Sequence, residues 1–363
     1  MRKKVAFITV HVGFNFGSIL QSIATAKVIN SLDKECELIN YIPDRVTYSR
    51  FFKKMFSGIL PFFRGIISLP NYINNNRLYG SYLEKYCKVS KPIYDKDDFA
   101  KKCPKADYYI TGSDQVWNSK HNEGFNDRYY FASLPKDTIK ISFASSIGST
   151  TLDDEEMNKI RTLLGNYKAI SVREKSAKEL LASIGINSEH LLDPTFMLDR
   201  KEWANYMNKR IVKEKYLFIY IPYSIVSKEE IYKLARQVAN EKNLKIITFS
   251  WNLKNEPLAD KTVKFANPGD FLSLMHHADY VITNSFHGTA FSINLNKQFS
   301  VFMPKAYSTR INSIIDLCGL HQRVVTEDYG ISDVNKAIDY DKVNAILDKE
   351  RIRSIEFLKK SFE

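Results

Sequence analysis

The alternation of short apolar runs with longer helix-like stretches is the feature that most constrains the fold of this chain. VAFITV (5–10) precedes the helix-like SILQSIATAKVINSL (18–32), and the same order returns along most of the sequence. Further strands are expected at 36–41, 107–113, 140–148, 167–174, 190–196, 215–223, 245–250, 279–284 and 299–304, and further helices at 175–184, 227–242, 268–278, 288–296 and 310–317. Strands alternating with helices favour parallel sheets that helices cover on both faces. The sequence therefore predicts an α/β fold.

The length of the chain and a polar stretch near its middle predict two domains. At 363 residues the chain exceeds the roughly 100–200 residues typical of one domain. The polar, charged stretch at 197–215 has the composition of a linker. We expect two Rossmann-like domains facing a central cleft, the first at 1–198 with an irregular insertion at about 42–105 and the second at 199–335. The remaining residues, 336–363, are expected to include a helix that crosses back to the first domain.

Composition excludes several functional classes. The first apolar run is too short for a signal peptide, and no run approaches the roughly 20 residues that span a bilayer, so we expect a cytoplasmic protein. The four cysteines form no CxxC pair and the seven histidines form no metal-binding cluster, so neither a metal nor a cofactor is expected. The net charge of +12 favours an anionic partner, either a phosphorylated small molecule or an anionic membrane. No nucleic-acid-binding module is visible, so nucleic acid is not an expected partner.

The segment RFFKKMFSGILPFFRGIISL (50–69) combines apolar residues with Arg50, Lys53, Lys54 and Arg64 and has no acidic residue. Such a composition suits a peripheral membrane contact, with apolar side chains in the interface and basic ones on anionic headgroups. Pro61 is expected to interrupt a continuous helix. The competing interpretation is a helical insertion that packs on the first domain.

The stretch TNSFHGTAFS (283–292) places a histidine where a strand turns into a helix. Ligands of open α/β folds bind at the carboxyl ends of the strands. The amino end of a helix, expected here at about Gly288, also favours anions. Alternatively, Ser285 only caps the helix and His287 is a hydrogen-bonded turn residue.

Other polar residues share this position at predicted strand ends. They are Asn15, Gly17, Asp114, Gln115, Trp117, Arg173, Glu174, Asp193, Lys305 and Arg310. Each has a structural explanation when taken alone; for example, Asp114 suits an Asx-turn and Asp193 caps a turn before Pro194. Their common location at one end of the strands favours a functional site, because residues with only structural roles would be scattered over both ends.

The ordered motifs NFGSILQSIA, GSDQVWN, SFASSIG, ISVREKSAKELL, LDPTF and VITNSFHGTAFSINLNK resemble the polysaccharide pyruvyl transferase family, especially the members found with bacterial capsule and exopolysaccharide genes. The resemblance covers about residues 4 to 325. It implies two Rossmann-like domains similar to the GT-B glycosyltransferases. It also implies transfer of a pyruvyl group from phosphoenolpyruvate, a co-substrate, to a sugar diol, which gives a cyclic ketal and phosphate.

The resemblance also suggests roles for individual residues. By motif, Arg173 matches the donor-binding arginine of the family and His287 its histidine. Many members read Arg-Leu-His-Gly where this chain reads Ser285-Phe286-His287-Gly288, so one anion-binding arginine is missing unless Lys305 or Arg310 replaces it. We expect catalysis by His287, with Asp114 or Glu174 sharing the proton transfers.

The remaining candidates divide between the two substrates. We expect the donor to be bound by Arg173, Ser285, Gly288, Lys305 and Arg310. We expect the saccharide acceptor, carried on a lipid in one version of the hypothesis, to be bound by Asn15, Gly17, Gln115, Trp117 and Asp193. The rival interpretations are a GT-B glycosyltransferase with a nucleotide-sugar donor, since a cationic site would also suit a diphosphate, and a binding protein without activity.

Overall fold

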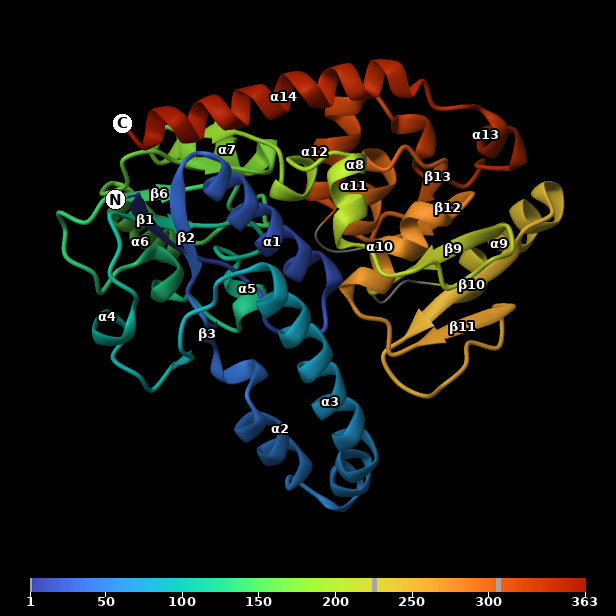
Figure 1. Ribbon diagram of the computed structural model, residues 1–363, viewed down its shortest axis with the longest axis horizontal. Coiled ribbons are helices and arrows are strands. Elements are labelled where there is room, and N and C mark those ends of the chain that lie inside the picture. The colour runs from blue at the N-terminus through green and yellow to red at the C-terminus, as the bar shows by residue number, and fades with distance from the viewer. Residues whose placement is uncertain (1, 224–226, 305–307) are drawn as a thin grey trace. The chain divides into compact units, whose positions relative to one another are not determined.

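The computed structural model describes residues 2–223, 227–304 and 308–363. Contacts between Cα atoms divide the chain into two compact units (Figure 1). The first comprises Met1–Met197 together with Ile352–Glu363, and the second comprises Leu198–Arg351. Each unit contains a parallel sheet packed with helices, as the alternation in the sequence predicts.

The first unit is built on a four-stranded parallel sheet in the order β2-β1-β5-β6. Its strands are β1 Lys3–Ile8, β2 Lys34–Leu38, β5 Tyr108–Thr111 and β6 Lys140–Ser142. Two short parallel pairs join β3 Tyr41–Ile42 to β4 Ile93–Tyr94 and β7 Ser171–Val172 to β8 Glu189–His190. The helical elements are α1 Phe16–Ser31, α4 Phe99–Lys102, α5 Ser119–Asn122, α6 Asp154–Leu164 and α7 Lys175–Ser183, with 3-10 turns η1 Asp44–Val46, η2 Asp127–Tyr130 and η3 Pro194–Phe196.

Besides the short elements η1, β4 and α4, residues 42–105 of the first unit contain the longer helices α2 Tyr48–Met55 and α3 Ile59–Tyr86. The insertion is therefore largely helical and not irregular. Pro61 does not interrupt a helix either: it lies in the first turn of α3, where a missing N–H costs no helical hydrogen bond. The break falls earlier, at 56–58, and α2 and α3 form a helical hairpin (Figure 1).

The second unit contains a five-stranded parallel sheet in the order β11-β10-β9-β12-β13. Its strands are β9 Tyr216–Tyr220, β10 Lys245–Ser250, β11 Lys261–Lys264, β12 Tyr280–Thr283 and β13 Phe299–Val301. The helical elements are α8 Arg200–Trp203, α9 Lys228–Lys242, α10 Pro268–His277, α11 Phe286–Asn294, α12 Thr309–Cys318 and α13 Ile331–Asn335, with 3-10 turns η4 Ala204–Tyr206 and η5 His321–Arg323. The stretch 197–215, expected to be a plain linker, thus includes α8 and η4.

The last helix, α14 Tyr340–Ser361, ends in residues that belong to the first unit. The Tyr108 hydroxyl at the start of β5 donates a hydrogen bond to the Phe362 carbonyl at 2.5 Å, and the two rings pack with centroids 5.0 Å apart. Arg353 donates to the His190 carbonyl at 2.6 Å. These contacts hold the carboxyl-terminal segment against β5 and β8.

Candidate functional site

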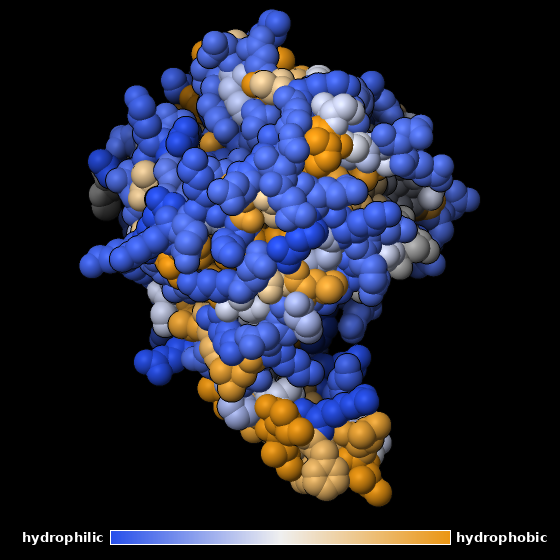
Figure 2. All heavy atoms as spheres, turned by 90° about the vertical axis from the view of Figure 1, so that its right-hand side faces the viewer, coloured by the Kyte–Doolittle hydropathy of each residue, from blue (hydrophilic) through white to orange (hydrophobic). Residues whose placement is uncertain are grey.

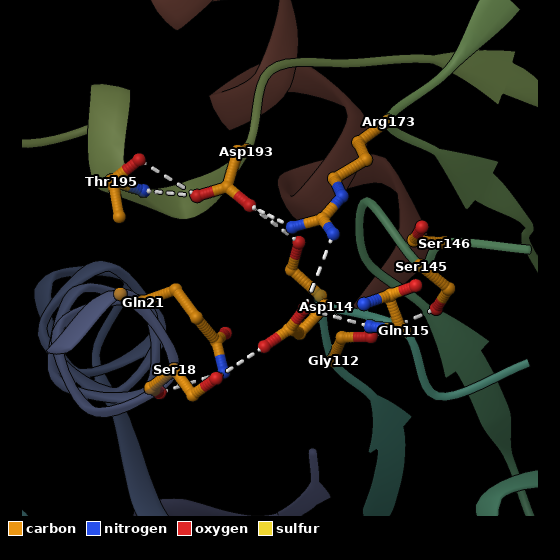
Figure 3. Close-up of polar contacts among 12 residues, drawn as sticks. Ser18, Gln21, Gly112, Asp114, Gln115, Ser145, Ser146, Arg173, Asp193 and Thr195 are labelled. Atoms are coloured by element: carbon orange, nitrogen blue, oxygen red, sulfur yellow. Dashed lines mark hydrogen bonds and ion pairs between the residues drawn. The ribbon is translucent and has the colours of Figure 1, made fainter. Parts of the chain in front are cut away.

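The loop after β5 positions Asp114 at the carboxyl edge of the first sheet (Figure 3). Asp114 has a positive φ of 68°, a conformation that is uncommon for residues other than glycine and often occurs at functional sites. Three donors converge on its carboxylate: the Ser18 hydroxyl at 2.5 Å, the Gln115 amide at 2.9 Å and Arg173 Nη2 at 3.2 Å. Helix α1 and the segment after β7 therefore meet at this carboxylate.

Arg173 is the centre of a buried ion cluster, and its side chain has no exposed surface. Each guanidinium nitrogen faces a different carboxylate: Nη1 is 2.7 Å from Asp193, Nη2 is 3.2 Å from Asp114 and Nε is 3.6 Å from Glu174. Burial alone would lower the pKa of Arg173, but the three carboxylates raise it above its ordinary value. Arg173 is therefore a permanent cation that holds three strand ends together.

Further hydrogen bonds fix the other two carboxylates of the cluster. Asp193 Oδ1 accepts hydrogen bonds from the backbone and the hydroxyl of Thr195 (Figure 3). Asp193 Oδ2 accepts one from the Ser113 hydroxyl at 2.8 Å. Glu174 accepts a short hydrogen bond from the Ser146 hydroxyl. Asp114 and Asp193 thus each receive donors from at least two segments, and Glu174 receives one from the loop after β6, which gives the cluster a defined geometry.

In the second unit, the corner between β12 and α11 contains the residues of the NSFHG motif. Helix α11 begins at Phe286, two residues earlier than expected, so His287 lies in its first turn. Ser285 occupies the N-cap position, but its side chain accepts no capping hydrogen bond from the described residues. His287 is buried, and its ring meets that of Phe286 edge-on with centroids 5.1 Å apart. The amino end of α11 thus combines a histidine with the partial positive charge of the helix.

Arg310 lies close to this corner. It stands in the first turn of α12, is buried, and holds its guanidinium 5.9 Å from the centre of the Phe286 ring. A fixed cation thus lies one side chain away from His287, in the unit that lacks the arginine of the Arg-Leu-His-Gly pattern. Lys305, the other proposed replacement, lies outside the described residues.

Comparison with known proteins now identifies the family. The model of the polysaccharide pyruvyl transferase family matches residues 15–305, which include the motifs of both units. The chain belongs to the polysaccharide pyruvyl transferase family. A search of curated proteins gives no match to the chain.

Solved structures confirm the fold expected for a pyruvyl transferase family member. A Listeria monocytogenes protein assigned as a UDP-N-acetylglucosamine 2-epimerase superposes with a TM-score of 0.55 at 9% identity, covering 99% of this chain and 91% of that chain. S. aureus MnaA, solved with UDP, gives a TM-score of 0.51 at 12% identity with the same coverages. At such low identities the similarity shows the fold alone. That fold is GT-B-like, with two Rossmann-like units that each contain a parallel sheet.

The geometry indicates structural roles for two residues that were expected to bind substrates, Arg173 by resemblance to the family and Asp193 by its position at a strand end. Arg173 was expected to bind the donor, but all three of its nitrogens face buried carboxylates. Asp193 was expected to bind the acceptor, but it is buried and both of its oxygens accept hydrogen bonds within the cluster. Displacing either group would leave buried charges without partners, which is costly. Both residues therefore hold the strand ends in place.

The loop after Asp114 also differs from expectation. Trp117 is buried in the core with its indole stacked on Tyr130, the centroids lying 5.4 Å apart, so it offers no surface for a sugar. Gln115 is buried as well, and its Oε1 accepts a hydrogen bond from Asn118 at 2.8 Å. These two residues shape the loop that carries Asp114.

Two glycine corners have structural explanations. Asn15 caps α1: its Oδ1 accepts hydrogen bonds from the amides of Gly17 at 2.9 Å and Ser18 at 3.3 Å. A Cβ on Gly288 would lie 2.9 Å from the Tyr220 ring and closer still to the Thr283 hydroxyl. Gly288 therefore lets α11 pack closely against β9 and β12. This packing alone accounts for a glycine at position 288, without the expected role in donor binding.

Sequence reasoning missed the hydroxyl groups that complete the first cluster, those of Ser18, Ser113 and Ser146. A signal was available for Ser18, because the helix sequence at 16–31 places Ser18, Gln21 and other small polar residues among apolar ones. Ser18, Gln21, Ser22 and Thr25 are all buried in α1. Buried polar residues in the first turns of a helix after a strand indicate a hydrogen-bond partner at the strand end.

Proposed function

We propose that the protein transfers the pyruvyl group of phosphoenolpyruvate to two hydroxyls of a saccharide, forming a cyclic ketal and releasing phosphate. The observation that carries this proposal is the family match, which extends over residues 15–305 and includes both the Asp114 corner and the His287 corner. The donor carries a phosphate and a carboxylate, so it needs fixed cations and helix N–H groups. The amino end of α11 and Arg310 would supply them.

The reaction needs one proton delivered to carbon and two protons removed from hydroxyls. Protonation of the methylene carbon makes C2 of the donor electrophilic, and the oxygen of the first hydroxyl attacks it and loses its proton. The C2–O bond to phosphate then breaks, and the second hydroxyl attacks C2 and loses its proton to close the ketal. We propose His287 as the group that moves protons at the donor, since histidine titrates near neutral pH.

We propose a positioning role for the Arg173 cluster. Its carboxylates, Asp114 and Glu174, are held by donors from several segments, so they keep the loop after β5 in its strained conformation. Asp114 and Glu174 thereby fix the edge of the first sheet. This assignment replaces the sharing of proton transfer that the sequence suggested for these two residues.

The decisive experiment supplies the purified protein with phosphoenolpyruvate and a set of lipid-linked and nitrophenyl sugars. We expect phosphate release that depends on the sugar, and a product whose mass corresponds to a pyruvyl ketal. Consumption of a nucleotide sugar in place of phosphoenolpyruvate would contradict the proposal and support a glycosyltransferase. Binding of phosphoenolpyruvate without turnover on any sugar would support a binding protein.

We also propose that the α2–α3 hairpin attaches the enzyme to an anionic membrane surface. Apolar side chains gather at the tip of the hairpin (Figure 2). Five of them are more than half exposed: Phe56, Ile59, Leu60, Phe63 and Ile67. No acidic residue occurs between Asp44 and Glu84. No helix among the described residues is long and apolar enough to cross a membrane.

Liposome flotation tests this attachment. Each basic residue near an anionic surface contributes about 1 kcal/mol, so replacing Lys53, Lys54 and Arg64 with Gln should remove about 3 kcal/mol, or roughly 100-fold in partitioning. High salt should weaken binding as well. The matched control replaces three other exposed cations of the first unit, Lys136, Arg161 and Lys178, with Gln. Equal loss of binding in both variants, or equal binding to neutral liposomes, would refute the assignment to the hairpin.

A further inference from the structure

We propose that a pocket at the root of the α2–α3 hairpin binds a glycosyl phosphate, the head of a membrane-carried saccharide acceptor. The pocket has a volume of about 760 Å³, within the usual range for small-ligand sites. It is formed by the loop after β1, the segment around η1, and the facing sides of α2 and α3. The proposal rests on the proposed pyruvyl transfer to a saccharide and names the place where the acceptor binds.

An aromatic group centred on Tyr72 forms one wall of the pocket. The Phe51 ring stacks on Tyr72 with centroids 4.6 Å apart, while Tyr48 and Phe14 meet Tyr72 edge-on at 5.1 and 5.5 Å. The Tyr72 hydroxyl donates to the Val46 carbonyl at 2.8 Å, which fixes the ring against η1. Rigid aromatic faces with polar edges provide the amphipathic surface that a sugar ring requires.

Basic residues supply the charge of the pocket. Among the described residues that line it, four are cationic and one has a carboxylate: Arg45, Arg50, Lys54 and Lys96, and Asp44. Arg45 is half-buried in the wall of the pocket, and its Nη2 donates a hydrogen bond to Asn122. This contact fixes one guanidinium group at the pocket wall. Guanidinium groups bind phosphate oxygens well because their N–H groups match the phosphate geometry.

The pocket is connected to the Asp114 corner. Val12, Gly13 and Phe14 line it, and the same loop leads into α1, whose Ser18 holds Asp114. On the other side, Arg45 Nη2 donates to Asn122 Oδ1 at 3.4 Å, and Asn122 in turn donates to the Gln115 and Val116 carbonyls at 3.2 and 3.0 Å. A saccharide in the pocket would therefore lie next to the loops that position Asp114 in the Arg173 cluster.

The location of the pocket selects among anionic ligands. A nucleotide could also stack on the aromatic rings and pair with the cations, but it has no lipid chain that would contact the apolar tip of the hairpin. A saccharide joined by phosphate to a lipid matches both surfaces. Its lipid would lie at the apolar tip formed by Phe56, Ile59 and their neighbours, and its glycosyl phosphate would lie in the pocket at the root. Charge and position thus both favour the glycosyl phosphate.

The test measures binding without donor, by ligand-observed NMR and calorimetry, for a panel of hexose 1-phosphates with the free hexoses, inorganic phosphate and UDP as comparisons. We expect at least one hexose 1-phosphate to bind more tightly than its hexose, inorganic phosphate or UDP. Arg45→Gln should weaken this binding about tenfold or more, the effect of losing a charge-assisted hydrogen bond. Arg45→Lys should restore part of it. The matched control is Arg77→Gln, which removes an exposed cation of α3 that does not line the pocket.

Each alternative result overturns the proposal. Binding of no hexose 1-phosphate, equal affinity in Arg45→Gln, or equal weakening in Arg77→Gln would show that the pocket is not this site. Inorganic phosphate bound as tightly as the sugar phosphates would indicate a simple anion site, and tighter binding of UDP would indicate a nucleotide site. Because these measurements use no phosphoenolpyruvate, they remain valid even if pyruvyl transfer is not the reaction. Conversely, sugar-dependent phosphate release in Arg45→Gln with an unchanged acceptor KM would overturn the pocket alone.

Discussion

Replacing Arg173 with methionine should destabilise the first unit selectively. The change removes the only guanidinium that faces Asp114, Asp193 and Glu174 among the described residues, while Met keeps much of the side-chain volume. Breaking a buried ion pair by removing one partner costs about 3–5 kcal/mol. We expect about 4 kcal/mol, because Asp114 and Asp193 keep hydrogen bonds to Ser18 and Thr195. Since domains are stable by about 5–15 kcal/mol, the variant should still fold.

The loss should also depend on pH. Carboxyl groups buried without a counter-charge prefer the protonated form, because burial penalises their charge. The folded variant therefore binds protons more readily than the unfolded chain, and its stability falls as pH rises. The difference in unfolding free energy between the variant and the unchanged protein should be larger at pH 8 than at pH 5. Adding Asp193→Asn removes one of the stranded charges and should recover about 1–2 kcal/mol.

Hydrogen exchange in increasing urea, followed by mass spectrometry, reports each unit separately. Amides of β5 and β7 should lose protection, while those of β12 in the second unit serve as the internal reference. The control Lys175→Met removes an exposed cation two residues away and should change stability by no more than about 0.5 kcal/mol. A loss below about 1 kcal/mol for Arg173→Met, or one that is the same at pH 5 and pH 8, would refute the view that this guanidinium holds the cluster together.

Three further predictions concern the second unit. His287→Ala should keep the fold but lower turnover about 100-fold or more, as expected for general acid–base catalysis; steady-state assays that find activity within a few-fold would remove His287 from the mechanism. Arg310→Ala should raise the KM for phosphoenolpyruvate and slow turnover, because the donor carboxylate or phosphate loses its charged partner, whereas an unchanged donor KM would exclude Arg310 as the replacement for the missing arginine. Gly288→Ala should destabilise the second unit by about 1–3 kcal/mol through overpacking against Thr283 and Tyr220, measurable by urea unfolding, and a stability equal to that of the unchanged protein would show that α11 can shift to make room.

The alternation of strands and helices could be predicted from sequence because burial on both faces of a parallel sheet makes each strand a short apolar run. The strand β10 matches its predicted bounds for this reason. The run at 140–148 ends as a strand at Ser142, since Ala144 adopts a positive φ of 52° that leaves the extended conformation. The local sequence does not predict a positive φ for this alanine. The edge strand β11 was missed because its sequence, KTVK, is mostly polar.

The location of the candidate site was likewise predictable, but the roles of its residues were not. Parallel strands bring their carboxyl ends to one edge, so Asp114, Arg173 and Asp193 were expected to gather there. Whether a charged residue faces a ligand or another charged residue depends on tertiary contacts, such as the one between Arg173 and Asp193 across 20 positions. The pocket proposed for the acceptor depends even more on such contacts, since its aromatic wall joins Phe14 to Tyr72.

The exposure of the tip of the α2–α3 hairpin separates the proposed membrane attachment from the stability of the fold. Phe56, Ile59 and Ile67 are already largely exposed in the folded chain, so replacing them removes little buried apolar area and should scarcely alter stability. Selection can therefore adjust their number and size to membranes of different lipid composition, while the sheets and the Arg173 cluster stay unchanged. The same exposure would make the purified protein self-associate through the tip. Polar substitutions at the tip should reduce this self-association without changing the residues of the candidate site.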